Sequence, residues 1–94
     1  MPKILHLTLM KKWFIDILEG KKKIEYREIK PYWTKRLFTA NGTPIIYDHI
    51  SFRNGYAKDA PTMNVEFLGV KEKEKYEIIL GNILETNNLE NLNN

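Results

Sequence analysis

The stretch Gly20-Lys-Lys-Lys-Ile-Glu-Tyr-Arg-Glu-Ile-Lys-Pro-Tyr-Trp33 places five cations and two carboxylates within fourteen residues. Gly20 ends a run of helical periodicity, and a glycine at this point is typical of a helix that closes in a left-handed residue. Residues 23–29 then alternate along the chain, which predicts a strand with Glu25 and Arg27 on the same side. The stretch therefore predicts a direct passage from a helix into a charged strand.

The segments on either side of this stretch complete a set of short elements. Residues 3–9 alternate between apolar and polar side chains, which predicts a first strand. Residues 11–19 repeat their apolar side chains at helical spacing and predict an amphipathic helix. Downstream we expect a short helix over residues 32–38, opened by a proline. Three more strands are expected over residues 45–52, 63–70 and 76–84, with an exposed charged turn over residues 71–75 between the last two.

These elements amount to five strands and two short helices in a chain of 94 residues, which is too short for a second core. The predicted fold class is α+β. Small sheets avoid exposed edges by curling, so we expect a small, partly closed β-barrel of about five strands. We expect one domain over residues 1–85 and a polar, asparagine-rich, frayed tail over residues 86–94.

The composition excludes several kinds of chemistry. The chain has no cysteine, which excludes disulfide scaffolds, cysteine-bound zinc and thiol catalysis. His6 and His49 fall on separate expected strands with no third ligand signalled, so we expect neither a metal site nor a cofactor. No apolar run is long enough for a signal peptide or a membrane span, and we therefore expect a cytoplasmic protein without a membrane partner.

The charges are divided unevenly along the chain. Residues 1–36 carry ten Lys or Arg against four Asp or Glu, a net charge of +6. Residues 37–94 carry five against eight, a net charge of −3, which leaves +3 for the whole chain. A basic half on a small domain favours an anionic partner.

The spacing of Lys22, Glu25 and Arg27 allows two interpretations. Glu25 and Arg27 lie about 6.5 Å apart along one strand face, opposite Ile24 and Tyr26, so their long side chains can meet or grip one ligand. In the first interpretation the charges form a solvated ladder that contributes about 0–1 kcal/mol per pair. In the second, Glu25 orients Arg27 or Lys22 inside a concave site, as binding and catalytic sites require.

The pattern Gly20-x-Lys22-x-x-Glu25-x-Arg27 after an amphipathic helix resembles the signature of the ASCH domain family. The resemblance covers about residues 3–84 and is to the small bacterial and phage-type members. It implies a PUA-like β-barrel that binds RNA or a nucleotide-like molecule in the cleft lined by the signature. The further matching segments are His6-Leu-Thr-Leu9, Glu28-Ile-Lys-Pro-Tyr-Trp33, Ser51-Phe-Arg-Asn-Gly-Tyr56 and Tyr76-Glu-Ile-Ile-Leu-Gly81.

The resemblance also implies an enzymatic alternative. Some small family members are amidohydrolases that act on N4-acylated cytidines with a lysine, a threonine and a glutamate. The lysine corresponds to Lys22 and the glutamate is best matched by Glu66, whereas the threonine position falls on Glu25, which has no hydroxyl. A metal-free hydrolase could instead use Glu25 or Glu66 to deprotonate water, with Lys22 or Arg27 stabilising the oxyanion. A ribonuclease activity is the other enzymatic reading, with no catalytic set assigned.

For the binding function, Lys22, Arg27 and Arg53 are the candidate phosphate contacts, since arginine can bind phosphate through two parallel hydrogen bonds. Tyr32, Trp33 or Tyr56 could stack on a base, with packing in the core as the alternative for Trp33. Residues 53–55 could instead form only a tight turn with no role in binding. A role as a protein-interaction module and the oligomeric state stay open. The full expected ligand-binding set is Lys22, Glu25, Arg27, Arg53, Asn54 and Tyr56.

Overall fold

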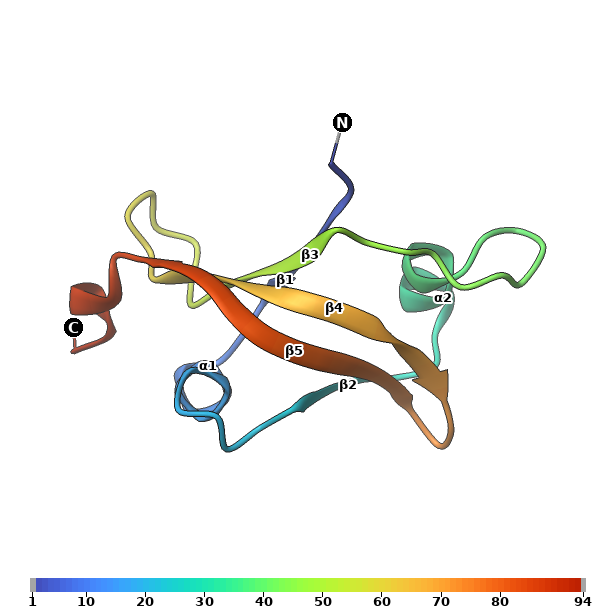
Figure 1. Ribbon diagram of the computed structural model, residues 1–94, viewed down its shortest axis with the longest axis horizontal. Helices are drawn as coiled ribbons and strands as arrows, with labels where there is room; N and C mark the ends of the chain where they lie inside the picture. The colour runs from blue at the N-terminus through green and yellow to red at the C-terminus, as the bar shows by residue number, and fades with distance from the viewer. Residues whose placement is uncertain (1, 94) are drawn as a thin grey trace.

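The computed structural model describes residues 2–93. Two α-helices separate the first three of five strands, the last three strands follow one another directly, and a short 3₁₀ helix comes last (Figure 1). In chain order the elements are β1 (Ile4–Thr8), α1 (Lys11–Leu18), β2 (Ile24–Arg27), α2 (Pro31–Leu37), β3 (His49–Arg53), β4 (Thr62–Glu72), β5 (Tyr76–Asn87) and the 3₁₀ helix η1 (Leu89–Asn93). Each expected element is present, although several begin or end elsewhere.

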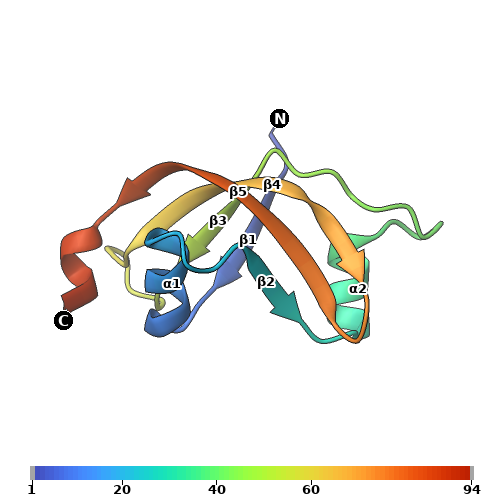
Figure 2. The same cartoon turned by 60° about the horizontal axis from the view of Figure 1, so that its bottom comes forward.

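The strands form one mixed sheet in the order β1-β3-β4-β5-β2. β1 runs parallel to β3, and the other three pairs are antiparallel. The sheet arches over its concave side, with α1 and α2 beneath the two ends of the arch (Figure 2). The protein is therefore an α+β half-barrel, and the expected partly closed barrel is confirmed. β1 and β2 are its two free edges, and they face each other across the open seam.

The concave face of the sheet carries the core. Leu7 of β1 lies opposite Phe52 of β3, which in turn lies opposite Met63 of β4, and all three side chains are buried. On the helical side, Phe14 and Ile17 of α1 are buried against this face. Buried and exposed residues alternate along the strands, because successive side chains point to opposite faces and only one face of each strand meets the core.

Local chemistry explains how the helices end and begin. Gly20 follows α1 with φ at +79°, a left-handed conformation that costs glycine little. Pro31 opens α2 in its first turn, where its missing N–H is not needed. Over residues 2–93, none of the helices has the length and apolar character that crossing a bilayer would demand.

The third strand is shorter than predicted. It begins at His49, whereas the sequence pattern placed its start at residue 45. The preceding segment is held by other partners, because Ile45 donates its backbone N–H to the Leu37 carbonyl at 2.9 Å and Asp48 donates to the Lys3 carbonyl at 2.8 Å. Ile46 is left 84% exposed, so its apolar character does not mark a strand here.

The C-terminal segment is more structured than expected. β5 continues to Asn87, and the η1 residue Leu92 is buried in the core cluster, so the expectation of a frayed tail is wrong for the residues described. Asparagines make this possible: Asn88 adopts a φ of 59°, which asparagine tolerates, and its side chain donates to the Ala60 carbonyl at 3.3 Å. Asn94 lies outside the described residues.

Gly81 of β5 leaves no room for a larger residue. A Cβ atom at this position would lie 2.8 Å from the Cβ of Glu66, whose Oε1 accepts the Asn82 backbone N–H at 2.7 Å. We expect Gly81→Ala to lower the free energy of unfolding by about 1–3 kcal/mol, the usual effect of overpacking. Urea unfolding checks this, with the exposed Asn82→Ala as a control that should change little. Equal stability of Gly81→Ala and the native protein would contradict the prediction.

Candidate functional site

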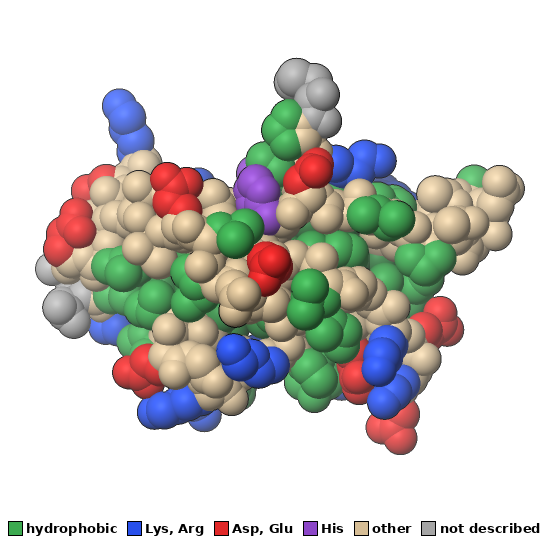
Figure 3. Space-filling model, viewed as in Figure 1, with side chains coloured by type: hydrophobic (Ala, Val, Ile, Leu, Met, Phe, Trp, Pro, Cys, Tyr) green, Lys and Arg blue, Asp and Glu red, His purple; other side chains and the backbone are tan. Residues whose placement is uncertain are grey.

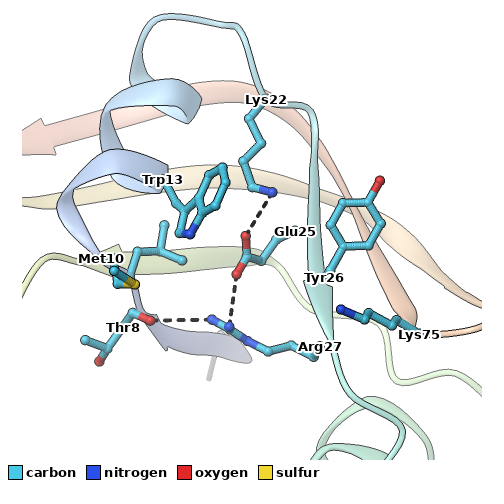
Figure 4. Close-up of a pocket in the computed structure, with 9 residues that line it drawn as sticks. Thr8, Met10, Trp13, Lys22, Glu25, Tyr26, Arg27 and Lys75 are labelled. Carbon is cyan, nitrogen blue, oxygen red and sulfur yellow. Dashed lines mark hydrogen bonds and ion pairs between the residues drawn. The ribbon is translucent and has the colours of Figure 1, made fainter.

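A pocket of about 640 Å³ lies at the seam where the two free edges of the half-barrel approach each other (Figure 4). Arg27 of β2 spans the seam, since its Nη2 donates to the Thr8 carbonyl of β1 over a long 3.4 Å. We call this hollow the seam pocket. It is lined by Thr8, Leu9, Met10, Trp13, Lys22, Glu25, Tyr26, Arg27 and Lys75.

Glu25 occupies a core position of the sheet. It lies opposite Ile78 of β5, which is fully buried, and its own side chain is only 5% exposed. The register thus directs a carboxylate to the concave face, where neighbouring strands carry apolar side chains. A carboxylate in such a place is very unfavourable unless cations and hydrogen bonds compensate it.

Two cations hold this carboxylate from opposite sides (Figure 4). The Lys22 Nζ lies 3.5 Å from Glu25 Oε1, and the Arg27 Nη1 lies 3.0 Å from Oε2. Their side chains are 16% and 20% exposed, so these charges form a largely buried cluster and not a solvated ladder. The cluster keeps one positive charge in excess, and the Arg27 Nε is buried without a hydrogen-bond partner.

Aromatic rings surround the two cations. The Lys22 Nζ lies 5.0 Å from the ring centroids of both Trp13 and Tyr26, and the Arg27 guanidinium lies 5.0 Å from that of Trp33. Such distances allow cation–π attraction. Trp13 and Tyr26 remain 40% and 45% exposed, which leaves ring surface available at the pocket for a planar ligand.

The turn after α1 places Lys22 in this position. The backbone N–H groups of Lys21 and Lys22 both donate to the Asp16 carbonyl, at 2.8 and 3.1 Å, once Gly20 has reversed the chain. Lys22 then points toward the seam while Lys21 points to solvent, where its hydrogen bond with Glu19 raises the pKa of the Lys21 ammonium. The glycine and the helix end thus fix which of three consecutive lysines enters the pocket.

Three of the predicted binding residues do not line the seam pocket: Arg53 ends β3, and Asn54 and Tyr56 lie in the turn that follows. Arg53 donates to two carbonyls of its own turn, those of Gly55 at 2.8 Å and Ala57 at 2.6 Å. Asn54 donates to the Leu9 carbonyl at 2.9 Å and so supports one wall of the pocket from behind. Tyr56 is 87% exposed. Arg53 and Asn54 hold the turn, and ligand contact by these three residues stays a prediction.

Glu66, the second glutamate of the hydrolase hypothesis, is not brought to Lys22 in the seam pocket. Its carboxylate bonds the Asn82 backbone on β5, and it does not contribute to the pocket lining. Over residues 2–93, no three His, Asp or Glu side chains gather in a way that could hold a metal ion. The acid–base candidate at the pocket is therefore Glu25, with both of its oxygens already paired.

Six residues of the pocket wall are not among the predicted site residues: Thr8, Leu9, Met10, Trp13, Tyr26 and Lys75. Trp13 is one of the apolar residues at helical spacing within residues 11–19, yet it adjoins Phe14, so the two rings lie on different faces of the helix and only Phe14 is buried. Lys75 belongs to the exposed charged turn expected over residues 71–75. It reaches the pocket because its neighbour Tyr76 pairs with Arg27.

The chain was compared with protein-family models, with curated proteins and with solved structures, and none of the three comparisons gave a match. The geometry of the seam pocket is accordingly the basis for a functional assignment.

Proposed function

We propose that this protein is an ASCH-type, PUA-like domain whose seam pocket binds a nucleotide-like ligand, either free or as a unit of RNA. The observation that carries the proposal is the buried cluster of Lys22, Glu25 and Arg27, set between the partly exposed rings of Trp13 and Tyr26. The seam pocket therefore offers contacts for an anionic group and for a planar group of one ligand.

The charge of the seam pocket favours an anion. Its lining contains three cations, Lys22, Arg27 and Lys75, against the single carboxylate of Glu25. Glu25 holds Lys22 and Arg27 in position, and the remaining N–H groups of the lysine can donate to a phosphate or carbonyl oxygen of the ligand. The carboxylate therefore acts as a positioning group.

The pocket walls favour a planar partner for that anion. Exposed indole and phenol rings offer stacking surface, and stacking on a base typically contributes about 1–3 kcal/mol. Trp13 and Tyr26 lie on either side of Lys22 (Figure 4), so a ligand can meet both a ring and the ammonium without rearrangement of the main chain.

The same geometry supports binding over hydrolysis. A general base needs a free lone pair within reach of the attacking water. Glu25 is paired to Lys22 on one oxygen and to Arg27 on the other, and Glu66 is engaged with the β5 backbone. Turnover of an acylated nucleoside by the purified protein would favour the amidohydrolase alternative.

The test is the affinity for nucleoside monophosphates measured by calorimetry or by quenching of tryptophan fluorescence. We expect Lys22→Met to weaken binding about 10–100-fold, since a hydrogen bond to a charged group contributes about 1.5–3 kcal/mol. Lys58→Met, which alters an exposed lysine in the turn after β3, is the matched control and should bind like the native protein. Equal affinities of the two variants would contradict the proposal.

A further inference from the structure

Four smaller hollows share side chains with the seam pocket, and two of them lie toward the helices on either side of β2. The first, the α1-side hollow of about 380 Å³, shares Trp13, Lys22 and Tyr26 with the seam pocket. The second, the α2-side hollow of about 290 Å³, shares Tyr26, Arg27 and Lys75 with it. Since they share these side chains, the three hollows lie next to one another along β2, from the end of α1 to the start of α2, and we call them together the groove.

Positive charge extends along the whole groove. The three hollows are lined by six cations and three carboxylates, a net charge of +3 that equals the net charge of the entire chain. Lysine and arginine side chains, with acidic ones among them, occur along the lower edge of the molecule by β2 and the β4–β5 turn (Figure 3). The six cations are Lys21, Lys22, Lys23, Arg27, Lys30 and Lys75.

The cations at the two ends of the groove are free to exchange partners. Lys21 pairs with Glu19, and Lys30 pairs with Glu28 at 3.2 Å, but these side chains are 50–70% exposed. Exposed pairs of this kind contribute little to stability. A phosphate can therefore replace the glutamate at either end with little loss, unlike at the buried Glu25.

Each part of the groove also contains an aromatic ring. Trp13 borders the α1-side hollow, Tyr26 borders all three, and Trp33 borders the α2-side hollow. Beyond Trp33 the pattern continues, because its ring packs edge-on against Tyr32, whose face carries the Arg36 guanidinium at 3.6 Å. Alternating rings and cations are the arrangement by which proteins hold successive bases and phosphates of a single strand.

We propose that the groove binds a single strand of nucleic acid several nucleotides long, with one base in the seam pocket and its neighbours in the two adjoining hollows. This inference rests on the proposed nucleotide-binding function of the seam pocket and adds the length and course of the ligand. A duplex fits less well, because its bases are stacked on one another and cannot stack on protein rings. An acidic peptide supplies charge but no regular series of planar groups.

The experiment measures the affinity of the full chain for uridine monophosphate and for oligouridylates and oligodeoxyuridylates of two, four and six nucleotides, at two salt concentrations. We expect at least a tenfold gain from one to four nucleotides and a steeper salt dependence for the longer strands, since each added phosphate releases counterions. Lys23→Ala and Lys30→Ala should each reduce that gain several-fold, whereas Lys58→Ala should not. Comparison of the two sugars shows whether the strand is RNA or DNA.

The results separate this inference from the proposed function. If uridine monophosphate binds in a Lys22-dependent way but longer strands bind no more tightly, the inference of an extended groove is overturned. The proposed nucleotide-binding function of the seam pocket would then still hold. The inference would also be overturned if affinity rose with strand length but Lys23→Ala and Lys30→Ala left that rise unchanged, because the strand would then lie elsewhere. Binding of an oligoglutamate of equal charge as tightly as the tetranucleotide would overturn it in favour of an acidic protein partner.

Discussion

Glu25→Gln is expected to lower the free energy of unfolding by about 2–4 kcal/mol, the range for breaking a buried ion pair from one side, reduced slightly for residual solvent access. The substitution keeps the shape of the side chain and removes its charge. Lys22 and Arg27, only 16% and 20% exposed, would then share a site without a counter-ion. Urea unfolding at neutral pH gives the measurement.

Glu28→Gln is the matched control for this prediction. Glu28 also pairs with a lysine, Lys30, at 3.2 Å, but both side chains are more than 60% exposed. Its replacement should change stability by no more than about 0.5 kcal/mol, as for exposed pairs in general. Equal effects of the two substitutions would show that burial does not govern the Glu25 cluster.

A second measurement on Glu25→Gln concerns the ligand and not the fold. Inorganic phosphate should raise the melting temperature of this variant more than that of the native protein, because phosphate would supply the missing negative charge between Lys22 and Arg27. A purely structural carboxylate would give no such difference. The comparison therefore distinguishes a cluster that is open to an anion from one that is merely packed.

The order of elements could be predicted because it depends on local patterns. Residues 11–18 repeat at helical spacing, Gly20 marks the end of the helix, and alternating runs mark the strands, so each element follows from its own residues. The start of β3 could not be predicted in this way. Ile45 bonds to Leu37 and not to a strand, and neither its polarity nor its spacing reveals that partner.

The charged members of the site could be predicted, whereas their environment could not. Lys22, Glu25 and Arg27 stand out by spacing alone, but the burial of Glu25 follows from its pairing with Ile78, more than fifty residues away. The same long-range pairing of β2 with β5 brings Lys75 to the pocket. Register between distant strands is therefore the information that a single sequence did not provide.

The remaining prediction tests whether the buried cluster serves binding or stability. In the triple variant Lys22→Met, Glu25→Leu, Arg27→Met, apolar side chains of similar volume replace all three charges at once. Replacing a complete buried ion cluster in this way is often neutral or stabilising by about 1–4 kcal/mol, since no charge then needs to be desolvated. We therefore expect urea unfolding to show a triple variant at least as stable as the native protein.

The same variant should lose the ligand. Without its cations the seam pocket keeps the rings of Trp13 and Tyr26, so stacking remains while the phosphate contacts are gone. We expect at least a 100-fold weaker affinity for nucleoside monophosphates, because two charge-assisted contacts of about 1.5–3 kcal/mol each are removed. A stable variant that does not bind would mean that three charges are kept at a core position for recognition. A destabilised variant that still binds would mean that the three charges are kept for stability, because the cluster would then hold the seam closed. The ligand would in that case depend on the rings alone.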